Sequence, residues 1–166
     1  MENIRAIIID DEERAKTSLK LLLNEYCKNI DVVGLYSNVP EGVLAINKHK
    51  PKIVFLDIEM PEYNGFELFN FFREIDFEII FVTAYNEFAL KAFEFSAVDY
   101  LLKPVDIDKL KGAVKKASSK INSIETLYKF ELLKETFNSQ QFNKIALPVS
   151  DGLSFINTDE ITYLEA

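Results

Sequence analysis

Short apolar runs alternate with amphipathic stretches over the first 105 positions of the chain. The apolar runs predict strands over Ile4–Ile9, Val32–Tyr36, Ile53–Leu56, Ile79–Val82 and Val98–Leu102. Because these runs are almost continuously apolar, they are typical of parallel strands that are buried on both faces. The stretches between them predict helices over Glu12–Cys27, Pro40–His49, Gly65–Arg73 and Asn86–Phe95, the last with Asn86 as its N-cap. The alternation therefore predicts an α/β fold, a doubly wound five-stranded parallel sheet with flanking helices.

Beyond Pro104 the pattern changes to a single long helical stretch, Val105–Asn138, which contains no proline. Its apolar residues recur at spacings of three and four, which predicts a helix with one continuous apolar seam. The members of this seam are Ile107, Leu110, Val114, Ala117, Ile121, Ile124 and Tyr128. We expect the first half to pack on the sheet. A helix of roughly 30 residues is about 45 Å long, so the outer half must pack on another domain or a second copy, or fray.

The last segment, Phe142–Ala166, has apolar residues at every second position and predicts two or three short strands. The strand-like runs are Ile145–Pro148, Leu153–Ile156 and Ile161–Glu165. About 25 residues are too few for an independent core, so we interpret this segment as the opening of a second domain. The sequence thus predicts a main domain over residues 1–120, a helical linker over 121–141 and a domain fragment over 142–166.

Polar residues follow four of the predicted strands at the point where each strand ends. They are the acidic pair Asp10 and Asp11, then Asp57, Thr83 and Lys103. The carboxyl ends of parallel strands meet at one edge of a sheet, so three carboxylates, a hydroxyl and an ammonium group should converge there. Each residue alone has an ordinary explanation, such as a helix cap or a turn. The five residues together, in this order at four strand ends, predict a functional site.

Three converging carboxylates repel one another, by about 4 kcal/mol for one pair at 4 Å and an effective dielectric near 20. Such a cluster needs a cation, and oxygen ligands beside a phosphoryl group suit Mg²⁺. We expect Asp10 and Asp11 to hold the metal with Asp57, and the backbone carbonyl of Glu59 to be a further ligand. Asp57 is then the candidate nucleophile toward a phosphoryl group, with Lys103 and the Thr83 hydroxyl as its partners.

Composition narrows the possible functions. The net charge is −8, and no segment has the concentration of basic residues that nucleic-acid binding requires. No apolar run approaches the roughly 20 residues of a membrane span, so we expect no membrane association. The single cysteine, Cys27, excludes an intramolecular disulfide and fits a reducing compartment, which predicts a cytoplasmic protein.

Residues 1–120 resemble the response-regulator receiver domain of two-component signalling, with all five of its characteristic polar residues present. The resemblance implies a flavodoxin-like sheet of strand order 2-1-3-4-5 and a sensor histidine kinase as partner. It implies Asp57 as phosphoacceptor, Asp10 and Asp11 as magnesium acids, Thr83 as switch hydroxyl and Lys103 as phosphate partner. It also implies Tyr100 as the aromatic switch and a cis bond between Lys103 and Pro104.

Two further segments resemble response regulators of the LytTR type. Residues 83–105 are similar to receivers that precede LytTR-type DNA-binding domains. Ile145–Pro148, Asp151-Gly152 and Ile161–Ala166 are similar to the start of such a domain. The resemblance implies homodimerisation on phosphorylation and DNA binding through a C-terminal domain of which this sequence holds only the first part.

Two other functions compete with a transcriptional response regulator. A stand-alone receiver would act by protein–protein interaction or phosphorelay, but it has no use for the strand-like tail. A phosphatase with a nucleophilic aspartate commonly carries an Asp-x-Asp motif, whereas Asp57 is followed by Ile58 and Glu59. We therefore expect no enzyme in the usual sense, since the chain would catalyse only its own phosphoryl transfer and autodephosphorylation.

Overall fold

The computed structural model describes residues 2–138, 144–149 and 152–157, with their side chains up to residue 133. Five strands form one parallel sheet in the order β2-β1-β3-β4-β5, which confirms the predicted 2-1-3-4-5 arrangement. The strands are β1 (Ile4–Ile9), β2 (Ile30–Tyr36), β3 (Ile53–Leu56), β4 (Glu78–Thr83) and β5 (Asp99–Leu102). Among the described residues, no helix has both the length and the apolar character that crossing a membrane requires.

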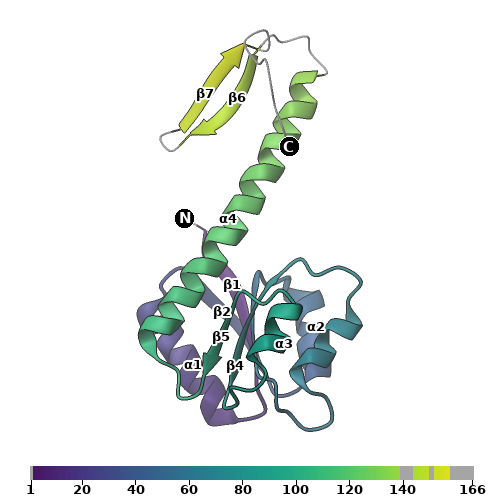
Figure 1. The fold of residues 1–166 in the computed structure, drawn as a ribbon, viewed down its shortest axis with the longest axis vertical. Coiled ribbons are helices and arrows are strands. Elements are labelled where there is room, and N and C mark those ends of the chain that lie inside the picture. Colours follow the sequence, from purple (N-terminus) through teal and green to yellow (C-terminus); the bar gives the residue numbers. More distant parts are fainter. Residues whose placement is uncertain (1, 139–143, 150–151, 158–166) are drawn as a thin grey trace. The chain divides into compact units, whose positions relative to one another are not determined.

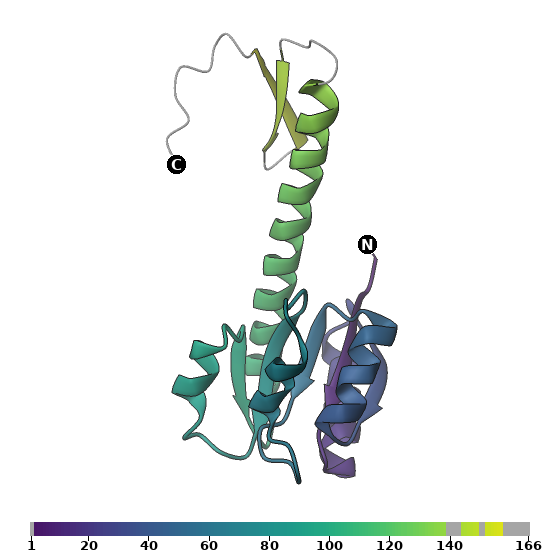
Figure 2. The ribbon, with the colours of Figure 1, turned by 90° about the vertical axis from the view of Figure 1, so that its right-hand side faces the viewer.

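Helices cover both faces of the sheet, as Figure 1 shows. Helix α1 (Glu13–Tyr26) and the first half of α4 (Ile107–Asn138) lie on one face. The other face carries α2 (Val39–His49), the 3₁₀ helix η1 (Gly65–Phe71) and α3 (Ala89–Glu94), and Figure 2 views the sheet from this side. Alternate strand residues therefore enter two separate cores.

The central strands are apolar throughout because both of their faces are buried. In β1, Ala6 and Ile8 pack with α1 and α4, whereas Ile7 and Ile9 pack toward α2. All four residues of β3 are fully buried. Burying one such aliphatic side chain contributes about 1.5–3 kcal/mol relative to leaving it exposed, so the sheet edge that carries the polar residues rests on a rigid base.

Helix α2 begins and ends at residues whose side chain or backbone conformation suits a helix end. The Asn38 side chain caps it by accepting a hydrogen bond from the Glu41 backbone N–H at 2.9 Å. Pro40 lies in the first turn, where its missing N–H costs nothing. Lys50 ends the helix in the left-handed conformation, with φ of 47°. The predicted helix over Pro40–His49 is confirmed to within one residue, and the caps at Asn38 and Lys50 were not predicted.

The predicted helix over Gly65–Arg73 is instead the 3₁₀ helix η1, and it ends at Phe71. Its aromatic residues Phe66 and Phe69 and the C-cap residue Phe72 are three apart, and residues at this spacing align on one side of a 3₁₀ helix. All three pack against the core on the α2 side. The α-helix prediction was wrong because packing of these rings selects the tighter repeat.

The predicted helix over Asn86–Phe95 is also shorter, since α3 begins at Ala89 and its N-cap position is Phe88. Asn86 therefore does not cap it. The preceding residues form a loop that is held by side chains from elsewhere. The backbone N–H of Tyr85 donates to the Thr83 hydroxyl, and the Tyr85 carbonyl accepts from the Tyr100 hydroxyl. These contacts hold Tyr85, and α3 begins four residues later at Ala89.

Helix α4 contains 32 residues, which corresponds to about 48 Å. Four members of the predicted seam, Leu110, Val114, Ala117 and Ile121, are buried, whereas Ile107 is 37% exposed. Beyond Ile121, Phe130 is half-buried, and five apolar side chains are exposed, those of Ile124, Leu127, Tyr128, Leu132 and Leu133. The prediction that only the first half packs on the sheet is confirmed, and the helix continues to Asn138 in place of a frayed end.

The chain divides into two compact units, Met1–Ile121 and Asn122–Ala166. In the second unit, β6 (Lys144–Val149) and β7 (Gly152–Asn157) pair in antiparallel fashion. They contain two of the strands predicted for the tail. The third predicted strand, Ile161–Glu165, lies outside the described residues.

Candidate functional site

The predicted polar residues lie at the carboxyl edge of the parallel sheet. Asp10 and Asp57 directly follow β1 and β3, Thr83 is the last residue of β4, and Lys103 directly follows β5. The register aligns these ends, since Ile9 pairs with Leu56 and Thr83 pairs with Leu102. Strand pairing alone therefore brings together residues that are up to 93 positions apart in the sequence.

Three carboxylates form a cluster at this edge. Asp10, Asp11 and Asp57 each offer an oxygen within 4.8 Å of the others. Asp10 and Asp57 are each only 4% exposed, whereas Asp11 lies at the surface. Oxygen donors with this much negative charge match the preference of Mg²⁺ for carboxylates and water. The donor set fits the predicted magnesium site.

The ammonium group of Lys103 is the cation that the described residues supply to this cluster. Its Nζ lies 2.7 Å from Asp10 Oδ2 and 3.2 Å from Asp57 Oδ2. A third carboxylate, that of Glu12, lies 3.3 Å away. The peptide bond between Lys103 and Pro104 is cis, as the resemblance implied. Lys103 thus joins the two buried aspartates.

Burial and charge change the proton affinity of these groups. Burial, and then the charge of Asp10, raise the pKa of Asp57 to about 6, because Lys103 offsets the two effects only in part. Burial lowers the pKa of Lys103, but the hydrogen bond to Asp10 and the charges of both aspartates outweigh it and raise that pKa above its usual value. At neutral pH Lys103 is charged and Asp57 is largely ionised, the form that a nucleophile needs.

The backbone around Asp57 holds its carboxylate in place. The Asp57 N–H donates to the Ile9 carbonyl at 2.9 Å, and the Ile58 N–H donates to Asp57 Oδ1 at 2.7 Å. Gly65 folds back onto this segment, where a Cβ atom would overlap the Asp57 carbonyl oxygen. The Gly65 N–H donates to the Ile58 carbonyl at 2.8 Å. Only glycine fits this close approach, a reason for Gly65 that the sequence could not show.

Thr83 and Tyr100, the predicted switch pair, are linked through Tyr85. The Thr83 side chain is fully buried, and its hydroxyl accepts from the Tyr85 N–H at 3.3 Å. Tyr100 is half-buried, and its hydroxyl donates to the Tyr85 carbonyl. A displacement of the Thr83 hydroxyl would therefore act on the same residue that holds the Tyr100 ring.

Sequence reasoning missed two contributions to the site. Glu12 reaches Lys103, and the Tyr85 backbone binds both switch residues. Neither contact has a local sequence signal, because each depends on where a loop meets a distant strand. The predicted role of the Glu59 backbone carbonyl as a metal ligand stays a prediction.

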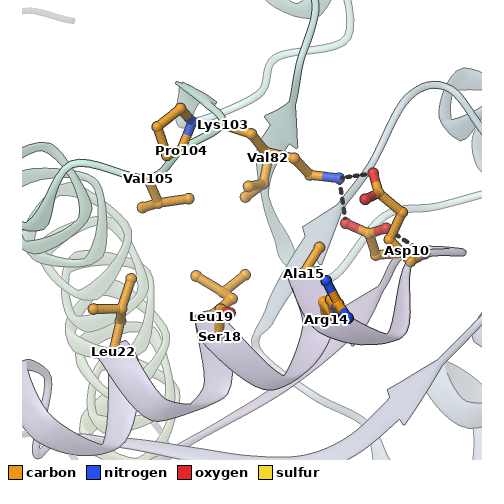
Figure 3. A pocket seen from close by; sticks show the side chains of 11 residues that line it. Asp10, Arg14, Ala15, Ser18, Leu19, Leu22, Val82, Lys103, Pro104 and Val105 are labelled. Atoms are coloured by element: carbon orange, nitrogen blue, oxygen red, sulfur yellow. Dashed lines mark hydrogen bonds and ion pairs between the residues drawn. The ribbon is translucent and has the colours of Figure 1, made fainter.

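A pocket of about 320 Å³ lies beside the cluster, and Figure 3 shows it from close by. Asp10 and Lys103 line one end of it. The remainder is lined mainly by apolar side chains of α1, such as Leu19 and Leu22, and by Pro104 and Val105. A partner could therefore rest on apolar surface while it reaches the polar edge of the sheet.

Comparison with known proteins places these features in a family context. Residues 6–115 match the model of the response regulator receiver domain. The chain is 34% identical over 164 residues to the sensory transduction protein LytT of Bacillus cereus, covering 97% of this chain and 65% of that protein. It is 47% identical over 114 residues to an uncharacterized response regulatory protein of Vibrio cholerae, covering 68% of this chain and 48% of that protein. The chain thus spans less than two thirds of the length of these relatives.

Solved structures show the same fold for the first unit. The response regulatory domain of protein mrkE from Klebsiella pneumoniae is 29% identical, with a TM-score of 0.65, and covers 72% of this chain and 99% of its own length. The receiver domain of AraT from Geobacillus stearothermophilus is also 29% identical, with a TM-score of 0.65, and covers 74% of this chain and 98% of its own.

Proposed function

Because the chain belongs to the response-regulator receiver family, we propose that Asp57 accepts a phosphoryl group from a sensor histidine kinase. The observation that carries this proposal is the contact of one ammonium group, that of Lys103, with two buried carboxylates, Asp10 and Asp57. This arrangement places a nucleophile beside groups that can hold a metal and neutralise a phosphoryl group.

The site residues then have distinct roles in phosphoryl transfer. An Asp57 carboxylate oxygen attacks the phosphorus of a phosphohistidine, the phosphorus–nitrogen bond breaks, and the imidazole leaves with a proton from solvent. Lys103 neutralises charge on the transferred phosphoryl oxygens. Asp10, Asp11 and Asp57 would hold Mg²⁺, which supplies further charge neutralisation when it is bound. The chain would act on its own aspartate and not as a turnover enzyme.

The kinase would approach over the pocket between α1 and the Lys103–Val105 segment. This pocket borders Asp10 and Lys103 at one end, and its remaining surface is mainly apolar. An apolar floor beside a charged edge suits a protein partner that must place one reactive side chain near Asp57.

Phosphorylation would change the structure through Thr83. In this structure the Thr83 hydroxyl accepts a hydrogen bond from the Tyr85 N–H. A phosphoryl group on Asp57 would attract that hydroxyl. Tyr85 also holds the Tyr100 hydroxyl, so the loop and the ring would move together. We expect this to reshape the face formed by α3, β5 and α4, and to favour a homodimer.

The proposed output is transcriptional control by a LytTR-type DNA-binding domain. The alignment with LytT extends over 164 residues and includes the segment of β6 and β7. A similar protein from Escherichia coli, 44% identical over 107 residues, is named transcriptional regulatory protein BtsR. A stand-alone receiver is the alternative, but it does not account for the antiparallel pair in the second unit.

Light scattering after size exclusion tests the proposal, with and without Mg²⁺ and the phosphoryl mimic beryllofluoride. We expect a mimic-dependent dimer of the wild type that Asp57→Asn abolishes. If the mimic binds Asp57 but the mass never changes, the dimerisation part is wrong and control acts on another partner. Failure of the mimic to bind would contradict phosphorylation of Asp57 itself.

A further inference from the structure

Lys103 has a third carboxylate partner, and it differs from the other two in its exposure. Glu12 Oε1 lies 3.3 Å from Lys103 Nζ, and the Glu12 side chain is 64% exposed. The side chains of Asp10 and Asp57, at 2.7 and 3.2 Å from the same nitrogen, are 6% and 5% exposed. Lys103 therefore bridges the buried acids and one acid on their solvent side.

The position of Glu12 is set by the site and not by helix capping. Glu12 occupies the N-cap position of α1, yet its side chain makes no cap hydrogen bond. Its backbone N–H instead donates to Asp10 Oδ1 at 2.8 Å. The backbone of Glu12 is thus fixed by one site acid, while its side chain reaches a lysine 91 positions away in the sequence.

A divalent cation and the Lys103 ammonium compete for the same acids. Mg²⁺ binds oxygen at about 2.1 Å, and a cation held by Asp10 and Asp57 would repel an ammonium group that stays 2.7 Å from Asp10. Lys103 must therefore leave Asp10, yet it must stay near enough to reach a phosphoryl group on Asp57. Glu12 is the acceptor that already lies within reach on the solvent side.

We propose that Glu12 is a positioning residue that draws the Lys103 ammonium off Asp10 when the cation binds, and so strengthens magnesium binding. This inference rests on the proposed function. Glu12 need not touch the cation, because it acts through Lys103. Without its charge, Lys103 stays on Asp10 and opposes the cation.

Glu13 provides a matched control. It is the next residue, its side chain is 78% exposed, and it pairs with Lys16 at 2.9 Å in place of Lys103. Glu12→Gln and Glu13→Gln remove the same charge from adjacent positions. A general effect of negative charge on the cation would weaken magnesium binding in both variants, whereas an effect through Lys103 is confined to Glu12→Gln.

The test is an NMR titration of backbone amides with MgCl₂, for the wild type and both variants, in the native and the Lys103→Met background. We expect Glu12→Gln to weaken binding by about threefold, the scale of one partly exposed ion pair, and Glu13→Gln to change it much less. In the Lys103→Met background, Glu12→Gln should have no effect. The amide spectra report whether each variant is folded.

Three results would contradict either the inference about Glu12 or the proposed function on which it rests. Equal weakening by Glu12→Gln and Glu13→Gln would replace the inference with a general charge effect. Weakening by Glu12→Gln that persists in Lys103→Met would mean that Glu12 acts on the cation without Lys103, which also overturns the proposed route. A wild type that binds no magnesium would overturn the magnesium part of the proposed function, and this inference with it.

Discussion

Ionisation of the Asp57 carboxyl group lowers the stability of the folded chain. Its pKa of about 6 in the folded chain exceeds the value of about 3.9 for an unfolded aspartate. The folded state therefore binds more protons between these values, and stability falls as the pH rises through them. Burial of the carboxylate, together with the charge of Asp10, is the cause of this cost.

This linkage predicts the pH dependence of an Asp57 variant. Asp57→Asn removes the charge and should raise the free energy of unfolding at pH 7 by about 1–2 kcal/mol. The gain should shrink as the pH falls from 6 to 4, where the wild-type carboxyl is increasingly protonated in the fold. Urea unfolding at several pH values measures it, with Asp76→Asn at an exposed position as control. A gain that is constant over this range would contradict the raised pKa.

Substitution of two glycines distinguishes a steric requirement for glycine at Gly65 from the general cost of glycine in a helix at Gly112. Gly65→Ala puts a Cβ atom against the Asp57 carbonyl oxygen, so the loop must shift. We expect a loss of about 1–3 kcal/mol of stability and weaker beryllofluoride binding. Gly112→Ala meets nothing within 4 Å inside α4, and should stabilise the fold by about 0.5–1 kcal/mol. Urea unfolding of both variants is the measurement, and equal effects would refute the steric argument.

At the scale of elements, local signals and tertiary contacts differ in what they predict. The strands and the extent of α2 follow from the sequence because apolar runs and Pro40 act within a few residues. The candidate site also followed, since parallel strand ends always share an edge. The 3₁₀ conformation of η1 and the start of α3 at Ala89 did not follow from the sequence. These depend on ring packing and on the contacts of Tyr85 with Thr83 and Tyr100.

Helix α4 combines a buried and an exposed apolar portion, and mutation should distinguish them. Leu110 is fully buried, and Leu110→Ala should cost the first unit about 2–5 kcal/mol through the lost contacts and the cavity. Leu127 is 65% exposed, and Leu127→Ala should change stability by less than about 0.5 kcal/mol. Thermal and urea unfolding compare the two variants. A large cost at Leu127 would show that its side chain is covered in solution.

At the scale of the whole molecule, the proposed switch requires that the phosphoryl site and the α3–β5–α4 face communicate. Within the structure, the Thr83 hydroxyl accepts from the Tyr85 N–H, and the Tyr85 carbonyl accepts from the Tyr100 hydroxyl. Each step is a hydrogen bond to one loop residue. A substitution at Tyr100 can therefore alter dimerisation in response to a phosphoryl mimic without altering the binding of the mimic at Asp57.

Tyr100→Phe makes this separation, because it removes only the hydroxyl that binds the Tyr85 carbonyl. A single hydrogen bond contributes about 0.5–1.5 kcal/mol, so the mimic-bound dimer should dissociate about 2- to 12-fold more readily. Beryllofluoride binding should be unchanged, since the hydroxyl that the substitution removes binds the Tyr85 carbonyl. Tyr63→Phe, which leaves the ring on Phe71, is the control. Sedimentation equilibrium measures dimerisation, and fluorine NMR measures mimic binding. Loss of mimic binding in Tyr100→Phe would place Tyr100 in the site itself, whereas unchanged dimerisation would show that the signal reaches the face by another route.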